Sequence, residues 1–208
     1  YHLQNNCDEE AVKEFSKALE MEPDYADAHY KLDNALTRQG KLNEGIGHYQ
    51  VALQLKPDEA RVHNDLGIAL VLAGKVPEAI GHYEQALRIK PEFTDAHMSL
   101  GIALSQQGKV AEAIGHYEQV LRLKPDYADA HDSLAGALVQ RGQLAEAIRH
   151  YEEALRLKPD SADTHNSLGV VLFRQGKAAE GIGHLKEAVR LKPDFVQARN
   201  NLKAALRQ

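Results

Sequence analysis

The chain has 208 residues, of which 43% are hydrophobic and 26% are charged, and its formal net charge is -5 at pH 7. This composition supplies enough apolar side chains for a folded core and argues against intrinsic disorder. The net negative charge argues against nucleic-acid binding, and no apolar run approaches the roughly 18 residues that a membrane span needs. A single cysteine, Cys7, excludes an internal disulfide and a CxxC zinc site, which fits a reducing compartment such as the cytoplasm.

Prolines recur at a constant spacing. Six of the seven prolines follow one another at intervals of 34 residues: Pro23, Pro57, Pro91, Pro125, Pro159 and Pro193. The neighbouring residues recur as well, since AIGHYEQAL at 79–87 returns as AIGHYEQVL at 113–121 and as AIRHYEEAL at 147–155. A constant period of this length predicts stacked repeats, each of which needs its neighbours to bury its apolar face.

The period divides the chain into complete and partial repeats. Residues 1–25 are expected to supply the end of one helix and a complete second helix, and residues 196–208 a single capping helix. The N-terminus has no such cap, so we expect that a repeat or a preceding domain is missing there. The five complete repeats occupy 26–59, 60–93, 94–127, 128–161 and 162–195.

Each complete repeat has the pattern of two helices joined by a turn. In the repeat at 60–93, Leu66 and Leu70 have helical spacing, and Ala79, Tyr83 and Ala86 continue it in a second helix. Between them one glycine per repeat is expected to adopt the left-handed conformation that ends a helix: Gly40, Gly74, Gly108, Gly142 and Gly176.

This pattern resembles the tetratricopeptide repeat, in which small residues occupy positions 8, 20 and 27, large apolar residues positions 7 and 24, and proline position 32. In the second complete repeat these positions hold Leu66, Gly67, Ala79, Tyr83, Ala86 and Pro91. The sequence departs from the pattern at Asp33 (position 8), Val120 (position 27) and Leu185 (position 24). The resemblance implies an all-α fold, a right-handed solenoid of stacked helix-turn-helix repeats whose first helices line a concave groove.

Ten histidines occupy only two repeat positions. Position 4 holds His29, His63, His97, His131 and His165, and position 23 holds His48, His82, His116, His150 and His184. Because the repeat spreads them along the chain, we expect a structural role for them and no metal site. No nucleophile turn or phosphate-binding glycine loop is present, so we expect no enzyme activity and no cofactor. Protonation of these ten histidines and of His2 near pH 6 would move the net charge from -5 towards +6 and change association.

The resemblance places positions 2, 5, 9, 12 and 13 of each first helix on the groove. Apolar residues at these positions are Ile68, Val71, Leu72, Met98, Ile102, Val139, Val170 and Phe173, and polar ones are Tyr30, Asn34, Asn64 and Asn166. Position 2 forms an acidic edge of Asp27, Asp95, Asp129 and Asp163. These residues predict a site for an apolar peptide or amphipathic helix with basic flanks, held through its backbone by Asn64 and Asn166. Alternatively, the apolar residues fill the core between neighbouring first helices.

Repeats of this family that clamp a carboxylate use lysine, arginine and asparagine at fixed groove positions. The best alignment of this chain places Tyr30, Asn34, Asp65, Asp95 and Ser99 there. Two carboxylates would face the carboxylate of the ligand, so binding of an acidic C-terminus is not expected.

Three functions fit the sequence. The first is a non-catalytic scaffold that binds a partner protein in the groove. The second is head-to-tail self-assembly, in which the partial repeats at the two ends complete each other. The third is a substrate-recruiting region of a larger enzyme, because the repeats resemble those of glycosyltransferases that transfer O-linked N-acetylglucosamine. Those repeats carry inward asparagines at position 6, where this chain has Lys31, Asp65, Ser99, Ser133 and Ser167.

Overall fold

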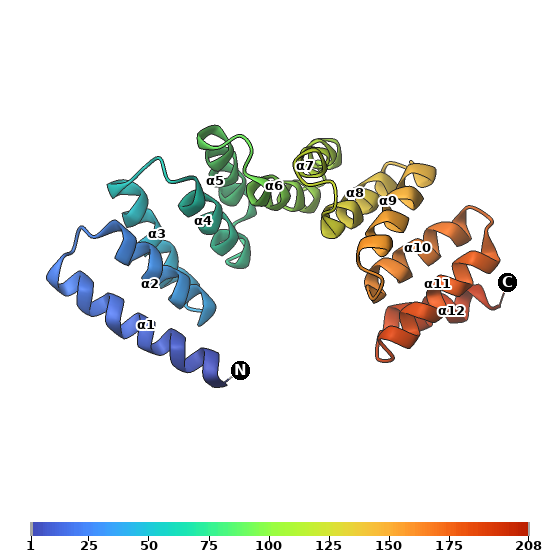
Figure 1. Ribbon diagram of the computed structural model, residues 1–208, viewed down its shortest axis with the longest axis horizontal. Coiled ribbons are helices and arrows are strands. Elements are labelled where there is room, and N and C mark those ends of the chain that lie inside the picture. Colours follow the sequence, from blue (N-terminus) through green and yellow to red (C-terminus); the bar gives the residue numbers. More distant parts are fainter. Residues whose placement is uncertain (1, 208) are drawn as a thin grey trace. The chain divides into compact units, whose positions relative to one another are not determined.

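The computed structural model describes residues 2–207, with side chains from Asp8 onward, so the Cys7 thiol lies outside the described part. Between residues 2 and 207 the chain forms twelve α-helices and no strand (Figure 1). These helices group into two compact halves, an N-terminal half, Tyr1–Ala103, and a C-terminal half, Leu104–Gln208. The predicted all-α fold is confirmed.

The N-terminal half contains α1 (His2–Met21), α2 (Ala26–Arg38), α3 (Leu42–Leu55), α4 (Ala60–Leu72), α5 (Val76–Ile89) and residues 94–103 of α6 (Thr94–Gln106). The C-terminal half contains residues 104–106 of α6, and then α7 (Val110–Leu123), α8 (Ala128–Gln140), α9 (Leu144–Leu157), α10 (Ala162–Arg174), α11 (Ala178–Leu191) and α12 (Val196–Ala205). From α2 onward, the even-numbered helices begin 34 residues apart.

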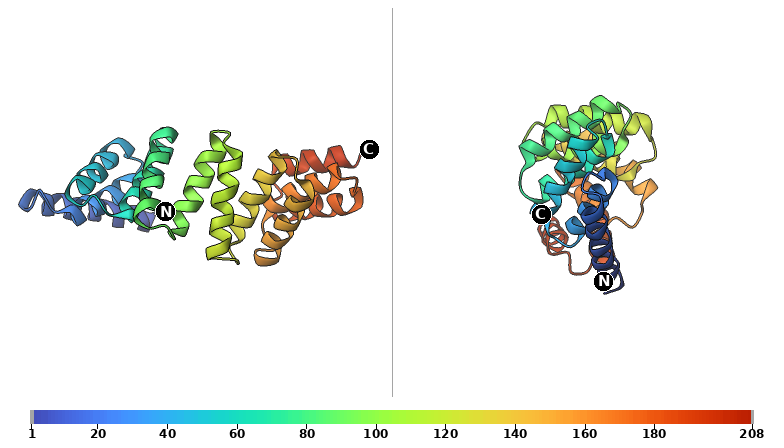
Figure 2. Two further views of the ribbon diagram at one scale, coloured as in Figure 1. Left: turned by 90° about the horizontal axis from the view of Figure 1, so that it is seen from above. Right: turned by 90° about the vertical axis from the view of Figure 1, so that its left-hand side faces the viewer.

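Helices that follow each other in the chain pack as antiparallel pairs (Figures 1 and 2). In the N-terminal half, α2 packs on α3, α3 on α4 and α4 on α5; in the C-terminal half, α8 packs on α9, α9 on α10 and α10 on α11. The second helices α3 and α9 therefore each lie between the first helix of their own repeat and the first helix of the next. No helix between residues 2 and 207 is both long and apolar enough to cross a membrane.

Glycine ends each first helix as predicted. Gly40 has φ 77°, its N–H donates to Thr37 O, and the N–H of Lys41 donates to Leu36 O. These two bonds close a helix C-terminus around a left-handed residue. Gly74, Gly108, Gly142 and Gly176 also have φ between 76° and 80°.

The first 25 residues differ from the prediction of two helices. The structure has one continuous helix, His2–Met21, in place of the expected end of one helix followed by a second helix. The position of the turn glycine is held by Asn6. Without glycine, a left-handed residue costs free energy, and the helix continues through this point instead.

The two helices of a repeat approach each other closely at position 8. In the second complete repeat, a Cβ atom added to Gly67 would lie 2.8 Å from Cδ1 of Tyr83, whose side chain is buried on the facing helix α5. Gly67 is therefore required by packing. On the outer side of α5, a Cβ atom added to Gly81 would have no neighbour within 4 Å among the described residues.

We expect opposite effects from two alanine substitutions in this hairpin. Gly67→Ala should destabilise the protein by about 1–3 kcal/mol, because the Tyr83 ring has to move. Gly81→Ala should stabilise it by up to about 1 kcal/mol, because alanine favours the helix and meets no neighbour. Urea unfolding followed by circular dichroism measures both, and equal effects from the two substitutions would contradict the packing described here.

The first complete repeat fills the same space in a different way. Position 8 is Asp33, whose side chain is 0% exposed, and position 20 of the facing helix is Gly45. A Cβ atom at Gly45 would overlap Oδ1 of Asp33, so the missing side chain of Gly45 makes room for the carboxyl group. Thr37 Oγ1 donates to Asp33 Oδ1 at 3.0 Å, whereas Oδ2 has no partner within residues 8–207.

Burial raises the pKa of Asp33 to about 8; the bond from Thr37 lowers it and the charge of Asp65 raises it. The native state therefore retains a proton that the unfolded chain, in which the carboxyl has its ordinary pKa of 3.8, has lost at neutral pH. Stability from this group is complete below pH 3.8 and is lost as the pH rises towards 8.

Asp33→Asn should remove this pH dependence, because the amide has the same shape and does not titrate. The difference in free energy of unfolding between variant and wild type should grow in favour of the variant between pH 5 and 8, by up to about 1.4 kcal/mol for each pH unit. Urea titrations at several pH values measure it. A constant difference over this range would show that Asp33 is not held protonated by the fold.

Candidate functional site

Exposed apolar side chains mark the predicted groove positions of the N-terminal half. Ile68 and Leu72 on α4 are 41% and 60% exposed, and Ile102 on α6 is 41% exposed. Leu66 and Leu70, on the same helix α4, are fully buried. These exposed aliphatic side chains do not fill a core, and such side chains grouped on adjoining repeats are typical of a contact surface. Val71 and Met98 are half-buried.

The C-terminal half has a small apolar cavity at the corresponding positions. Val170, Phe173 and Arg174 of α10 line a cavity of about 210 Å³ together with Leu185 of α11 and with Asn201, Ala204 and Ala205 of α12. A volume of this order suits a single large apolar side chain, since a cavity of roughly 150 Å³ accepts benzene. Val139 on α8 is half-buried and does not line this cavity.

The two groove asparagines are used within the protein. Asn64 and Asn166 are only 4% and 6% exposed. Nδ2 of Asn64 donates to Oδ1 of Asp65 at 3.0 Å, and Oδ1 of Asn166 accepts from Nδ2 of Asn201 at 2.8 Å. Oδ1 of Asn64 has no partner within residues 8–207. Both side chains are thus buried and bonded to neighbouring polar groups, and a role in holding a ligand backbone stays a prediction.

Tyr30 and Asn34 belong to a hydrogen-bonded network instead. The Tyr30 hydroxyl donates to Oδ2 of Asp65 at 2.8 Å, and Nδ2 of Asn34 donates to the Tyr30 carbonyl at 2.9 Å. Oδ1 of Asn34 accepts from the Tyr49 hydroxyl at 3.1 Å. The network connects α2, α3 and α4, and burial, together with the bond to Asp65, raises the pKa of Tyr30.

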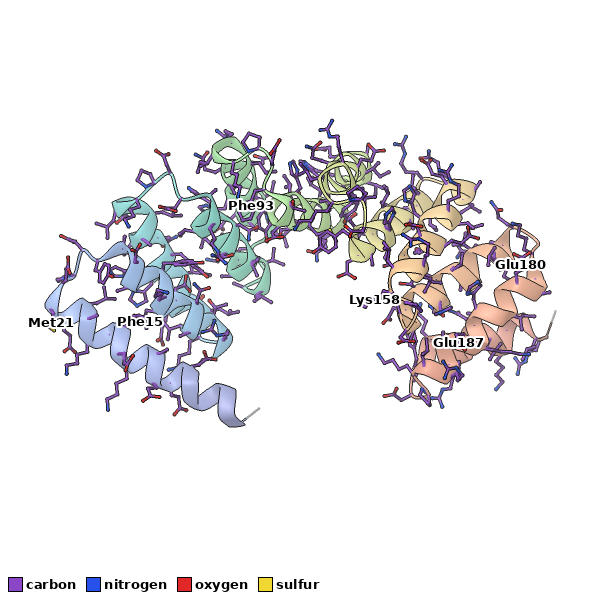
Figure 3. All side chains as sticks on the ribbon, in the orientation of Figure 1. Phe15, Met21, Phe93, Lys158, Glu180 and Glu187 are labelled. Atoms are coloured by element: carbon purple, nitrogen blue, oxygen red, sulfur yellow. The ribbon has the colours of Figure 1, made fainter. Side chains whose placement is uncertain are left out.

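A second hollow, of about 420 Å³, lies beside this network. Phe15 of α1, labelled in Figure 3, lines it together with Ala11, Tyr30, Lys31, Asn34, Arg38, Arg61 and Asp65. Arg38 is paired with Asp8 at 2.8 Å. Phe15 and Lys31 were not among the predicted groove residues. Lys31 could have been found from the sequence, because it occupies position 6 of its repeat, next to the positions on the inner face.

The acidic edge is partly neutralised. Nζ of Lys56 lies 2.9 Å from Oδ1 of Asp27, and Nζ of Lys158 lies 3.5 Å from Oδ1 of Asp129. All four aspartates of the edge are exposed. Asp95 and Asp163 make no ion pair within residues 8–207, so these two carry the remaining negative charge of the edge.

The repeated histidines bond to one another and to backbone carbonyls. Nδ1 of His131 lies 2.9 Å from Nδ1 of His150, and Nε2 of His131 lies 2.9 Å from the carbonyl oxygen of Pro125. Among residues 8–207, no group of three or more His, Cys, Asp or Glu side chains is placed to hold a metal ion.

Two family models match the chain, and both describe the same repeat. A family model described as "TPR repeat" matches residues 2–40, 34–74 and 136–176, and one described as "Tetratricopeptide repeat" matches residues 64–128. Together they match well over half of the chain. No curated protein sequence matches it.

Several solved structures share the fold. YrrB, described as a TPR protein with an unusual peptide-binding site, is 24% identical, with a TM-score of 0.76 over 91% of this chain and 97% of its own. PilF of Pseudomonas aeruginosa is 22% identical, with a TM-score of 0.84 over 98% and 92%. MamA of Desulfovibrio magneticus RS-1 is 20% identical, with a TM-score of 0.76 over 82% and 97%.

Proposed function

Because the chain belongs to the tetratricopeptide repeat family, we propose that it is a non-catalytic scaffold that binds an apolar segment of a partner protein on its first helices. Repeats of this family typically mediate protein–protein interaction. The observation that carries the proposal is the exposure of Ile68, Leu72 and Ile102 at positions 9 and 13, which face away from the second helices.

Each half, taken by itself, offers a different kind of contact to an apolar segment. Ile68, Leu72 and Ile102, here called the strip, are exposed apolar side chains on the first helices of successive repeats, and such a set suits a row of apolar side chains from an amphipathic helix or an extended peptide. The cavity beside Val170 and Phe173 suits one large apolar side chain. Asp95 and Asp163, which lack a lysine partner among residues 8–207, favour basic residues beside the apolar ones.

A non-catalytic role is supported by the placement of the titratable groups. Asp33, whose pKa is raised to about 8, is fully buried beneath α3 and does not face a substrate. Burial likewise raises the pKa of Tyr83 to about 12, and this side chain packs against Gly67 in the core of its hairpin. These two pKa shifts come from packing, and neither Asp33 nor Tyr83 lines the strip or the two hollows, whereas Tyr30, whose pKa is also raised, lines the second hollow.

The likeness to YrrB supports a peptide ligand, because that protein has the same fold and is described as having a peptide-binding site. At 24% identity, the likeness extends to the fold alone. The ligand of this chain is therefore argued from its own exposed side chains.

A displayed library of random peptides should yield ligands with apolar residues and flanking lysine or arginine. Ile68→Glu and Ile102→Glu should each weaken the binding of a selected peptide at least about tenfold, because each removes an apolar contact and adds a charge that binding would bury. Met98→Glu should act in the same direction. Isothermal titration calorimetry measures the affinities.

Leu55→Glu is the matched control. Leu55 ends the second helix α3, is 37% exposed and is not at a groove position, so its replacement should leave peptide affinity unchanged. Equal losses from Leu55→Glu and Ile102→Glu, or full binding by the Ile68 and Ile102 variants, would show that the strip is not the binding surface.

A further inference from the structure

One pair of histidines joins the two helices of a repeat in each of four repeats. Nδ1 of the first-helix histidine faces Nδ1 of a second-helix histidine 19 residues later. The four histidine pairs and their N···N distances are His29–His48 (2.9 Å), His63–His82 (3.1 Å), His131–His150 (2.9 Å) and His165–His184 (2.9 Å).

The other ring nitrogen of each first-helix histidine fixes where the protons lie. Nε2 of His165 is 3.0 Å from the carbonyl oxygen of Pro159, and the same bond, at 2.8–3.0 Å, recurs at His29, His63 and His131. A carbonyl oxygen only accepts, so Nε2 carries the hydrogen. Nδ1 of a neutral first-helix histidine is then an acceptor, and the second-helix histidine has to donate from its own Nδ1.

The rings meet head on. In the His29–His48 pair the ring centroids are 5.1 Å apart and the two Nδ1 atoms are 2.9 Å apart. The difference is about the width of one ring, as expected when both nitrogens lie on the line between the two centroids. In the His63–His82 pair the values are 5.4 and 3.1 Å. The two Nδ1 axes therefore point at each other, which suits an N–H···N bond. Axes in this arrangement do not converge on a third atom, so the pairs are not preformed chelating sites.

This geometry limits the number of protons that a pair can hold. A first added proton can go to Nε2 of the second-helix histidine, which leaves the N–H···N bond intact. A second would place a hydrogen on both facing Nδ1 atoms, which leaves no acceptor between two positive rings. The doubly protonated rings have to separate.

We propose that each histidine pair forms a joint, which is a hydrogen-bonded contact that can hold one added proton but not two. At neutral pH its hydrogen bonds connect the two helices of the repeat and the preceding proline turn. In acid, a second added proton breaks the contact between the two rings. The joint is separate from the apolar strip and gives the stack a dependence on pH that the proposed binding does not require. Four copies of it act on four different hairpins.

The electrostatic surroundings likewise disfavour two positive charges in one pair. Burial and then the charge of the facing histidine lower the pKa of His48, His82, His150 and His184. His184 faces His165 of α10, Glu152 of α9, and Glu180 and Glu187 of α11 (Glu187 is labelled in Figure 3), and these carboxylates oppose the shift. His150 faces His131 of α8, and Glu146, Arg149 and Glu153 of its own helix.

The sign of the effect follows from these directions. Since the native pKa of His184 is below the ordinary histidine value of 6.5, the native state binds fewer protons than the unfolded chain in weak acid. Stability from the pair is therefore complete above pH 6.5 and is lost as the pH falls through the lowered native value.

His184→Asn tests the joint. Nδ2 of asparagine is as many bonds from Cα as Nδ1 of histidine, so the variant keeps the donor, and its amide can turn to accept when His165 becomes charged. The unfolding equilibrium constant of the wild type should therefore rise faster with acid than that of the variant, by up to about tenfold per pH unit below roughly pH 6.5. Urea unfolding between about pH 7.5 and 5 measures the ratio.

His184→Gln is the matched control, because it also removes the charge but carries its amide one bond farther out. It should be less stable than His184→Asn already at neutral pH. The same pH slope in wild type and His184→Asn would overturn the proposal, as would equal stability of the two variants at neutral pH.

Nitrogen-15 spectra of the full chain give a second, independent reading. At neutral pH, His165 should be the Nε2–H tautomer and His184 the Nδ1–H tautomer. On acidification, one ring of the pair should charge while the helices remain intact, and the second should charge only as the helical signal is lost. Both rings charging in a fully folded chain, or the opposite tautomers, would overturn the proposal.

Discussion

The close approach of two helices within each repeat is the constraint on which the rest of the structure depends. At Gly67 the backbone of α4 comes so near to Tyr83 that no side chain fits, and at Gly169 the backbone of α10 meets Leu185 and the carbonyl of Gly181 in the same way. Because this contact uses one face of the first helix, positions 9 and 13 are turned away from it. The exposure of Ile68 and Leu72 is thus a consequence of how tightly position 8 is packed.

The same constraint explains an irregular repeat. Asp33 places a carboxyl group where other repeats have glycine or alanine. The carboxyl group fits between the helices because residue 45 on the facing helix is glycine and has no side chain. The side chains at this contact fill a similar volume, but one of them is now titratable. Because the buried carboxyl has no charged partner, it stays protonated instead of ionising. Packing complementarity can therefore keep the hairpin closed while making its stability depend on pH.

Polar contacts add a second type of connection between the helices. The apolar core holds each pair of helices together without regard to pH, whereas the pairs such as His131–His150 connect them through a single hydrogen. The bond from His131 to Pro125 extends this connection to the turn before the repeat. The proposed binding surface and the histidine pairs occupy different repeat positions, 9 and 13 against 4 and 23, so a substitution can change one of them without the other.

The sequence by itself determined the period, the helical class and the turns of the five complete repeats, because these depend on local rules: glycine ends a helix, proline prevents its continuation, and apolar residues three and four apart share a face. It did not predict the single continuous helix α1. For Ile68, Leu72 and Ile102 it left two interpretations, a groove surface or a filled core, and the structure shows all three side chains exposed. Only the tertiary structure decided which polar residues are buried and which partners they contact. Asn64 and Asn166 are buried, Lys56 neutralises Asp27, and the histidines of positions 4 and 23 meet across the hairpin. The partners in such pairs lie about 20 to 35 residues apart in sequence, and whether two such groups meet depends on a few tenths of an ångström in helix packing, which no periodicity records.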